Sequence, residues 1–405
     1  MSWQRAHAHA KSAFLSARDW RERYLTRVRS QWSQFLLREV DSWSRWVDLP
    51  PTQRLRNLRD GFLSHSAALY DFDSYGRAAY LSDIQRERTA FINKPEFSRV
   101  LANKVGFYLA MEQFDEHRPE TFGVIADGQF HPVSTTRQLL ADESSQPADA
   151  VGQTVPATST AAADDETGAV DAATWVCAQL EARTQLVLKP VHDAGGTGVK
   201  RVALEDGRYS VNGEPTSRAG LCQMVSTLSN AVAMELVEQA AYARRLFPAA
   251  TNTIRVLTMW DAERQEVFSP AVTHRIGTSH SAPVDNFDRA GLSAAIDHET
   301  GELNTAIQLA ADGTVRHCDS HPETDRQIAS QQIPGWARII DRLRDIAEAF
   351  SYIPYVGWDI VVTGPGEFVL LEANNCPGVK SLQAHEPLLT DDRTRRFYEE
   401  HNVCA

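Results

Sequence analysis

The stretch that most constrains this chain is YVGWDIVVTGPGEFVLLEANNCPG, residues 355–378 of 405. Two apolar runs rich in β-branched residues, 355–362 and 368–373, lie on either side of a Gly-Pro-Gly sequence at 364–366. Apolar runs of this length separated by a Gly-Pro-Gly turn are typical of two antiparallel strands. The stretch is therefore predicted to form a β-hairpin.

Each predicted strand carries one carboxylate in an otherwise apolar setting. A hairpin that turns at Pro365 places Asp359 opposite Glu372, or within one residue of it. Asn374 points the same way as Glu372, because strand side chains alternate with a period of two. Charges on a buried hairpin are costly unless they are compensated, and a divalent cation that prefers oxygen ligands compensates both acids at once. We therefore predict a magnesium site; the alternative is that the acids pair with Lys or Arg elsewhere in the chain.

The order of these residues also resembles a known family. An aspartate on one strand, followed by E-x-N and then P-G, resembles the metal-binding end of the ATP-grasp ligases, and LEANNCPG is similar to the D-alanine:D-alanine ligases. The resemblance implies that Asp359, Glu372 and Asn374 hold magnesium, in two ions that bridge the phosphates of ATP. It also implies an α+β fold in which two subdomains sandwich the nucleotide.

Composition agrees with a globular chain of two or three domains. It is 42% hydrophobic, and no apolar run approaches the roughly 20 residues that span a bilayer. The N-terminus, MSWQRAHAHAKSAF, lacks the apolar core of a signal peptide. The five cysteines include no C-x-x-C pair, which favours a reducing cytoplasm and argues against zinc or a disulfide framework.

The net charge of −12 is unevenly distributed along the chain. Residues 1–60 hold 12 Lys and Arg against 6 Asp and Glu, so the remainder of the chain is strongly acidic. An acidic body makes nucleic acid an unfavourable partner.

Residues 2–66 are rich in helix formers and contain five tryptophans, with a break at Leu49-Pro50-Pro51. Apolar residues at broadly helical spacing predict two or three amphipathic helices. We expect residues 1–100 to form a helical N-terminal extension that caps the ligase body. A basic surface bearing tryptophan could instead rest on an anionic membrane or contact a glycan-assembly partner.

Residues 141–173 form an acidic segment that is low in large apolar side chains. No Lys or Arg occurs between Arg137 and Arg183, and the same interval holds eight acids. Such a segment cannot bury enough surface to offset the entropy of ordering it. We predict a disordered insertion within one domain, and not a domain boundary.

A candidate phosphate cradle lies at 184–204, TQLVLKPVHDAGGTGVKRVAL. A short strand ends at Lys189, a loop of small residues follows, and a second strand begins near Val199. Glycine lets backbone N–H groups approach phosphate oxygens, and a lysine neutralises their charge. The order resembles the ATP-grasp flap, which implies that Lys189 binds the α- and β-phosphates under a lid formed by Gly195, Gly196 and Gly198. Alone, the motif is most often a simple hairpin.

Two further nucleotide contacts are implied by the resemblance. Residues 102–114 are predicted to be a helix, and Lys104 near its start matches the lysine that reaches the phosphates in ATP-grasp enzymes. Residues 231–239 are predicted to be the strand whose end holds adenosine, through Glu235, Leu236, Val237 and Glu238. The alternatives are a solvated lysine and an edge strand with solvated glutamates.

Two arginines on predicted strands, Arg255 and Arg275, suit a transferred phosphoryl group or a carboxylate. NTIRVLT at 252–258, with Asp285-Asn286 and then Gly291, resembles the sugar-transfer-associated ATP-grasp branch. The D-alanine:D-alanine ligases have an arginine two residues before the metal aspartate, whereas this chain has Gly357. Arg255 or Arg275 is therefore expected to supply that charge, and D-Ala-D-Ala synthesis is not expected.

The sequence thus predicts an ATP-grasp chain with a central subdomain at 101–240 and a C-terminal subdomain at 241–405. The expected reaction is Mg-ATP-dependent ligation of a small-molecule carboxylate to an amine through an acylphosphate, without a protein nucleophile. A small-molecule or sugar kinase and a non-catalytic ATP-binding module are the alternatives.

Overall fold

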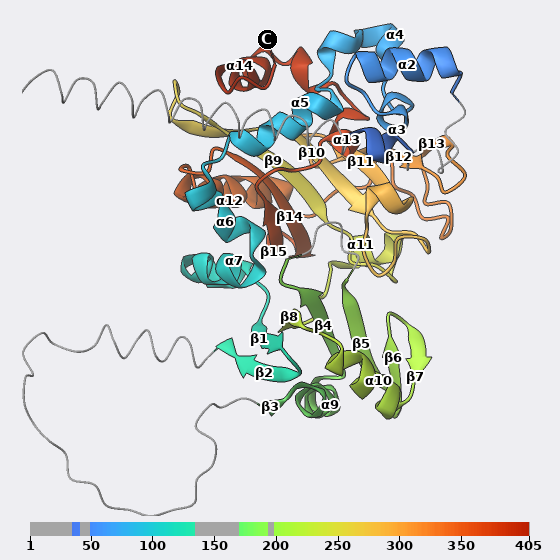
Figure 1. Cartoon of the computed structure of the whole chain (residues 1–405), viewed down its shortest axis with the longest axis vertical. Helices are drawn as coiled ribbons and strands as arrows, with labels where there is room; N and C mark the ends of the chain where they lie inside the picture. The colour runs from blue at the N-terminus through green and yellow to red at the C-terminus, as the bar shows by residue number, and fades with distance from the viewer. Residues whose placement is uncertain (1–34, 41–48, 134–169, 193–197, 405) are drawn as a thin grey trace, which may run out of the picture. The chain divides into compact units, whose positions relative to one another are not determined.

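The computed structural model describes residues 35–40, 49–133, 170–192 and 198–404 (Figure 1). The chain divides into two compact units. The first comprises Met1–Asn93, Ile307–Arg316 and Gly378–Ala405, and the second comprises Lys94–Ala306 and His317–Pro377. Every candidate nucleotide and metal residue that the structure describes belongs to the second unit.

The described part of the first unit is mainly helical, as predicted for the N-terminal region. Tyr70 and Tyr80 stack at 4.5 Å between ring centroids. The fully buried Gln383 accepts a hydrogen bond from Leu81 N and donates one to Leu81 O, which ties the C-terminal segment to the N-terminal one. Its helices are residues 35–40, α2 Pro51–Arg59, α3 Ser64–Ala67, α4 Phe72–Tyr75, η1 Arg77–Ala79, α5 Asp83–Arg88, η2 Thr89–Phe91, α13 Lys380–Gln383, η5 Leu388–Thr390 and α14 Asp392–Glu400.

Much of the predicted amphipathic region lies outside the described residues. The helical residues 35–40 expose Leu36, Leu37 and Val40. The expected contact with a membrane or a glycan-assembly partner stays a prediction. Within the described ranges, no helix combines the length and the apolar character needed to cross a bilayer.

The second unit contains an eight-stranded sheet with the order β3-β2-β1-β8-β4-β5-β6-β7. The helices α9 and α10 lie against one of its faces (Figure 1). The bounds are β1 Thr121–Ala126, β2 Gln129–Pro132, β3 Val170–Asp171, α9 Ala172–Arg183, β4 Gln185–Pro190, β5 Lys200–Glu205, β6 Arg208–Val211, β7 Glu214–Thr216, α10 Arg218–Ser226 and β8 Asn230–Met234.

Alternation along β4 gives the two faces of this sheet different roles. Leu186 and Leu188 point into the apolar core beneath α9 and α10. Val187 belongs to a separate apolar cluster on the opposite face, and Lys189 is two residues further along the same strand. The strand therefore directs Leu186 and Leu188 into this core, and Val187 and Lys189 toward the opposite face.

Three sequence predictions about this sheet are tested by the structure. The hairpin at 184–204 is confirmed, with β4 antiparallel to β5. The strand predicted at 231–239 is too long: β8 ends at Met234, because pairing with β1 stops there. The insertion predicted at 141–173 lies outside the described residues except for 170–173, and these are ordered. Asp171 caps α9 by accepting a hydrogen bond from Thr174 N, which places residues 172 and 173 inside the helix.

A seven-stranded sheet, most of it in this second unit, has the order β13-β12-β11-β10-β9-β14-β15. Its strands are β9 Ile254–Asp261, β10 Glu266–Ile276, β11 Leu292–Ile296, β12 Leu303–Leu309, β13 Val315–Cys318, β14 Tyr355–Gly364 and β15 Glu367–Asn374. The remaining helices are α6 Pro95–Ala102, α7 Lys104–Ala110, η3 Glu112–His117, α11 Ala241–Leu246, η4 Phe287–Arg289 and α12 Trp336–Ala349.

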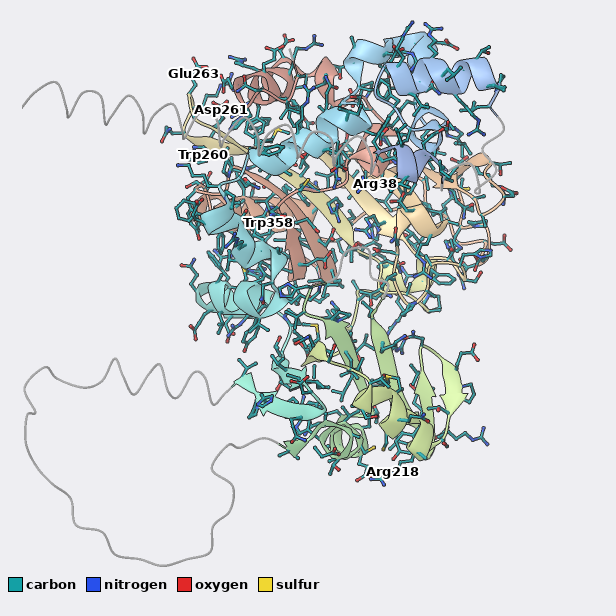
Figure 2. The ribbon with its side chains drawn as sticks, viewed as in Figure 1. Arg38, Arg218, Trp260, Asp261, Glu263 and Trp358 are labelled. Atoms are coloured by element: carbon teal, nitrogen blue, oxygen red, sulfur yellow. The ribbon has the colours of Figure 1, made fainter. Side chains whose placement is uncertain are left out.

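The predicted hairpin at 355–373 is confirmed as β14 and β15, and the sheet around it has one apolar and one charged face. Trp358 on β14 (Figure 2) is fully buried among the core residues and donates to Thr258 Oγ1 at 2.8 Å. The neighbouring Asp359 points to the opposite face because successive side chains alternate. The apolar face thus fixes β14, and the other face is left for polar chemistry.

Candidate functional site

Strand register places three charged side chains in one row across the seven-stranded sheet. Asp359 on β14 pairs with Glu372 on β15, as predicted, and with Arg255 on β9. Arg275 lies on the next strand, β10, and its backbone N–H donates to Thr253 O at 2.7 Å. The hairpin supplies the acids, and the two central strands supply the arginines.

Arg255 grips Asp359 through two parallel hydrogen bonds. Nε donates to Oδ1 at 2.5 Å and Nη2 donates to Oδ2 at 2.8 Å, and both residues are buried. A Cβ at Gly357 would lie 2.5 Å from Pro377 Cβ, so the close approach of Pro377 leaves no space for a side chain at this position.

Arg275 links Asp359 to a second buried acid, Asp285. Its Nη2 donates to Asp285 Oδ1 at 2.9 Å, whereas its Nη1 lies 3.3 and 3.4 Å from the two oxygens of Asp359. Burial would lower the pKa of Arg275, but Asp285 and then Asp359 outweigh it, and the pKa is raised. The guanidinium is therefore permanently charged.

The pKa values of the two cross-strand acids, Asp359 and Glu372, are shifted in opposite directions. Burial would raise the pKa of Asp359, but the charges of Arg255 and Arg275 hold it well below its usual range. Burial, followed by repulsion from Asp359, raises the pKa of Glu372. The Nδ2 of Asn374 lies 3.3 Å from an oxygen of each acid. Rotation of this amide by 180° would turn its oxygen toward both acids. All three predicted metal ligands are thus brought together.

The two predicted phosphate lysines approach the same acids. Desolvation lowers the pKa of Lys189, partly offset by the charge of Glu372, and Lys104 adds to the lowering. Lys104 opens α7, as predicted, and Asn103 caps this helix by accepting from Val105 N and Gly106 N. The helix predicted at 102–114 is too long: α7 ends at Ala110 and the separate helix η3 follows. Among the described residues, no carboxylate oxygen lies within 4 Å of the Lys189 ammonium.

The predicted adenosine segment follows β8. The carboxylate of Glu235 accepts a hydrogen bond from Glu120 N at 2.8 Å, so it fastens the segment to the start of β1. Leu236 packs against the apolar cluster on the Lys189 face of the sheet, formed by Val187, Val191, Val232 and Met234.

The outer part of this segment is less enclosed. Val237 is half-buried and Glu238 is exposed. In the predicted glycine lid, Gly198 lies in a turn before β5, and Gly195 and Gly196 lie outside the described residues.

Two residues of the network, Asp285 and Thr253, were not predicted as site residues. Asp285 is buried and accepts hydrogen bonds from Thr253 N at 2.7 Å and from Thr253 Oγ1 at 2.5 Å. The only sequence signal for Asp285 was its place in the Asp-Asn…Gly motif. Its partners lie on β10 and just before β9, and spacing alone does not reveal that contact.

The model of the sugar-transfer-associated ATP-grasp family matches residues 84–392. The chain belongs to this family. The matched region includes every candidate site residue on both sheets, so the ATP-grasp fold predicted from the hairpin and the Lys-Pro loop is confirmed.

Solved structures similar to this ATP-grasp chain include an L-amino acid ligase from Bacillus licheniformis, at 11% identity and TM-score 0.34 over 71% of this chain and 44% of that one. D-cycloserine synthetase DcsG is similar at 14% identity and TM-score 0.35, over 76% of this chain and 73% of that one. A D-alanine-D-alanine ligase from Coxiella burnetii is similar at 10% identity and TM-score 0.34, over 76% and 60%. The chain thus spans less than half of the first of these proteins. A search of curated proteins gave no match.

ATP-grasp enzymes in general use ATP and Mg²⁺. In the described part of this chain, no three His, Cys, Asp or Glu side chains gather into a metal-binding group. The donors present are two carboxylates and an amide, a hard oxygen set that suits magnesium when phosphate oxygens complete the shell. Asp359 fits this set only in part, because both of its oxygens already accept hydrogen bonds from Arg255.

Beside Arg275 in this ATP-grasp chain, His274 is fully buried on the apolar side of β10. Its Nε2 lies 3.1 Å from Tyr242 Oη and its Nδ1 lies 3.0 Å from Arg275 O. Burial lowers the pKa of His274 to about 4. The imidazole is therefore neutral at pH 7.

We expect His274 to make the protein less stable in acid. The unfolded chain takes up this proton near pH 6.5 and the folded chain only near pH 4, so stability is lost as the pH falls through this window. The loss is about 3 kcal/mol when complete. Thermal unfolding of wild type and His274→Gln at pH 7, 6 and 5 measures it, and the variant should show a shallower decline. His131→Gln, at an exposed position on β2, should keep the wild-type decline; equal slopes for all three proteins would contradict the prediction.

Proposed function

We propose that this chain is a Mg-ATP-dependent ligase that joins a carboxylate to an amine through an acylphosphate. The observation that carries the proposal is Lys189, a half-buried cation whose ammonium is desolvated and has no carboxylate within 4 Å among the described residues. A desolvated charge with no carboxylate in direct contact is costly, and a polyphosphate would compensate it. The apolar cluster on the same sheet face supplies a surface suited to a purine.

The remaining residues divide the work of binding. Lys104 and Lys189 would neutralise the phosphates beneath the lid of Gly195, Gly196 and Gly198. Backbone groups of Glu235, Leu236 and Val237 would hold the adenine, and Glu238 would hold the ribose. Such a division matches phosphoryl transfer, in which positioning and charge neutralisation provide most of the catalysis.

In the proposed reaction, a substrate carboxylate oxygen attacks the γ-phosphorus and the bond to the ADP oxygen breaks. The amine nitrogen then attacks the acyl carbon, phosphate leaves, and the nitrogen loses a proton. Glu372, Asn374 and Asp359 would hold magnesium, which would neutralise charge on the phosphates when bound. An arginine of the 255/275 pair would stabilise the transferred group.

The test is formation of ADP and hydroxamate by the purified chain with Mg-ATP, hydroxylamine and pools of amino acids, peptides and sugar acids. A ligase gives both products, and the pool that responds identifies the class of carboxylate. Lys189→Met should abolish both, whereas Lys200→Met, at the start of β5, should retain them. ADP made with an acceptor but without hydroxamate would favour the kinase alternative. ATP binding with neither product in any pool would count against the ligase.

A further inference from the structure

The two buried arginines of the site are held in different ways. Arg255 uses Nε and Nη2 in two short hydrogen bonds to one carboxylate. Arg275 has one short hydrogen bond, to Asp285, and two long contacts with Asp359. Its Nε is buried and has no hydrogen-bond partner among the described residues. The Nε of Arg255 is thus paired with a carboxylate, whereas the buried Nε of Arg275 has no such partner among the described residues.

Asp285 is itself rigidly anchored. One oxygen accepts both hydrogen bonds from Thr253, which leaves the other oxygen for Arg275. The next residue, Asn286, accepts a hydrogen bond from Asp288 N and so fixes the turn that begins η4. Asp285 therefore holds one end of the Arg275 guanidinium at a defined place beside Asp359.

We propose that Asp285 is a positioning residue that makes Arg275, and not Arg255, the arginine that contacts the γ-phosphoryl group of a nucleoside triphosphate. The inference rests on the proposed use of ATP. A buried donor without a partner costs free energy, and an anion that accepts from it recovers that cost. Arg255 could contact the same anion only by giving up hydrogen bonds to a buried carboxylate. Asp285 prevents Arg275 from closing fully on Asp359 in the same manner.

The test compares the affinities of ADP and of the non-hydrolysable triphosphate AMP-PNP by calorimetric titration in Mg²⁺. Asp285→Asn keeps the shape of the side chain and an oxygen for Thr253, but turns an N–H toward Arg275. We expect AMP-PNP to bind about 10-fold more weakly to this variant, with ADP changed by less than about 3-fold. Arg275→Lys should show the same selective loss, and it provides the answer if Asp285→Asn does not fold.

The matched control is Thr305→Val on β12, which removes a comparable threonine-to-aspartate hydrogen bond, to Asp319 at 2.6 Å, outside the Arg275 network. This variant should keep the wild-type ratio of the two affinities. Equal losses for both nucleotides in Asp285→Asn and Arg275→Lys would overturn the inference and leave the use of ATP standing. A selective loss of AMP-PNP affinity in Arg255→Lys, and not in the other two variants, would also overturn the inference. If wild type binds neither nucleotide, the proposed function fails as well.

Discussion

Replacing Arg255 by Met is expected to lower the free energy of unfolding by about 3–5 kcal/mol, because it leaves Asp359 charged and buried without its main partner. The side chains of Arg255 and Asp359 are only 10% and 5% exposed, so water cannot replace the lost hydrogen bonds. Arg275 approaches Asp359 at 3.3 Å, but it is already committed to Asp285. Thermal unfolding should show a melting temperature lower by about 5–10 °C.

The control for Arg255→Met is the double variant Arg255→Met/Asp359→Asn. Removing both charges leaves no uncompensated carboxylate, so the double variant should recover at least half of the lost stability. A melting temperature of Arg255→Met within about 2 °C of wild type would contradict the prediction, and it would mean that Arg275 alone compensates Asp359. A double variant less stable than Arg255→Met would show that Asp359 stabilises the fold through its hydrogen bonds even when Arg255 is absent.

The sequence was sufficient for the parts of the site that local patterns determine. Two apolar runs and a Gly-Pro-Gly turn predicted the hairpin, and the period of two then placed Asp359 opposite Glu372 with Asn374 beside them. Lys189 at the end of a strand and Lys104 at the start of a helix were found for the same reason. Each is defined by a few neighbouring residues whose preferences agree.

The pairing of Arg255 with Asp359 could not be predicted, because these residues are 104 positions apart. Hydrophobic periodicity identifies strands but does not say which strands are neighbours. Here β9 pairs directly with β14, although the two strands are far apart in the sequence. Asp285 was missed because a loop acid looks solvated in a sequence. Its burial depends on Thr253 and Arg275, which come from two other segments.

The two interpretations that the sequence left open for Asp359 are not mutually exclusive in the structure. Pairing with an arginine and binding a metal were alternatives, yet Asp359 is paired with Arg255 and still adjoins Glu372 and Asn374. Asp359 and Glu372 are therefore stabilised by different positively charged groups. Asp359 receives most of its compensating positive charge from the arginines, and Glu372 is left with the more distant lysines.

Glu372→Gln should for this reason raise stability while it weakens nucleotide binding. The pKa of Glu372 is raised, so wild type loses stability as the pH rises from about 4.5 through the folded-state pKa. Glutamine does not ionise, so the variant should have a higher melting temperature than wild type at pH 8 and should differ little from it near pH 4. Affinity for Mg-ATP should fall on the order of 100-fold, because one of two carboxylate ligands is lost.

Opposite signs for stability and binding separate a functional carboxylate from a structural one. Glu367→Gln, at an exposed position on the same strand β15, should change neither quantity and serves as the control. A Glu372→Gln variant that is less stable than wild type at pH 8 would mean that the lysines satisfy this acid without a metal. An unchanged affinity for Mg-ATP would remove Glu372 from the proposed magnesium site. Gain of stability together with loss of binding is the result that the arrangement of Asp359, Glu372 and Lys189 predicts.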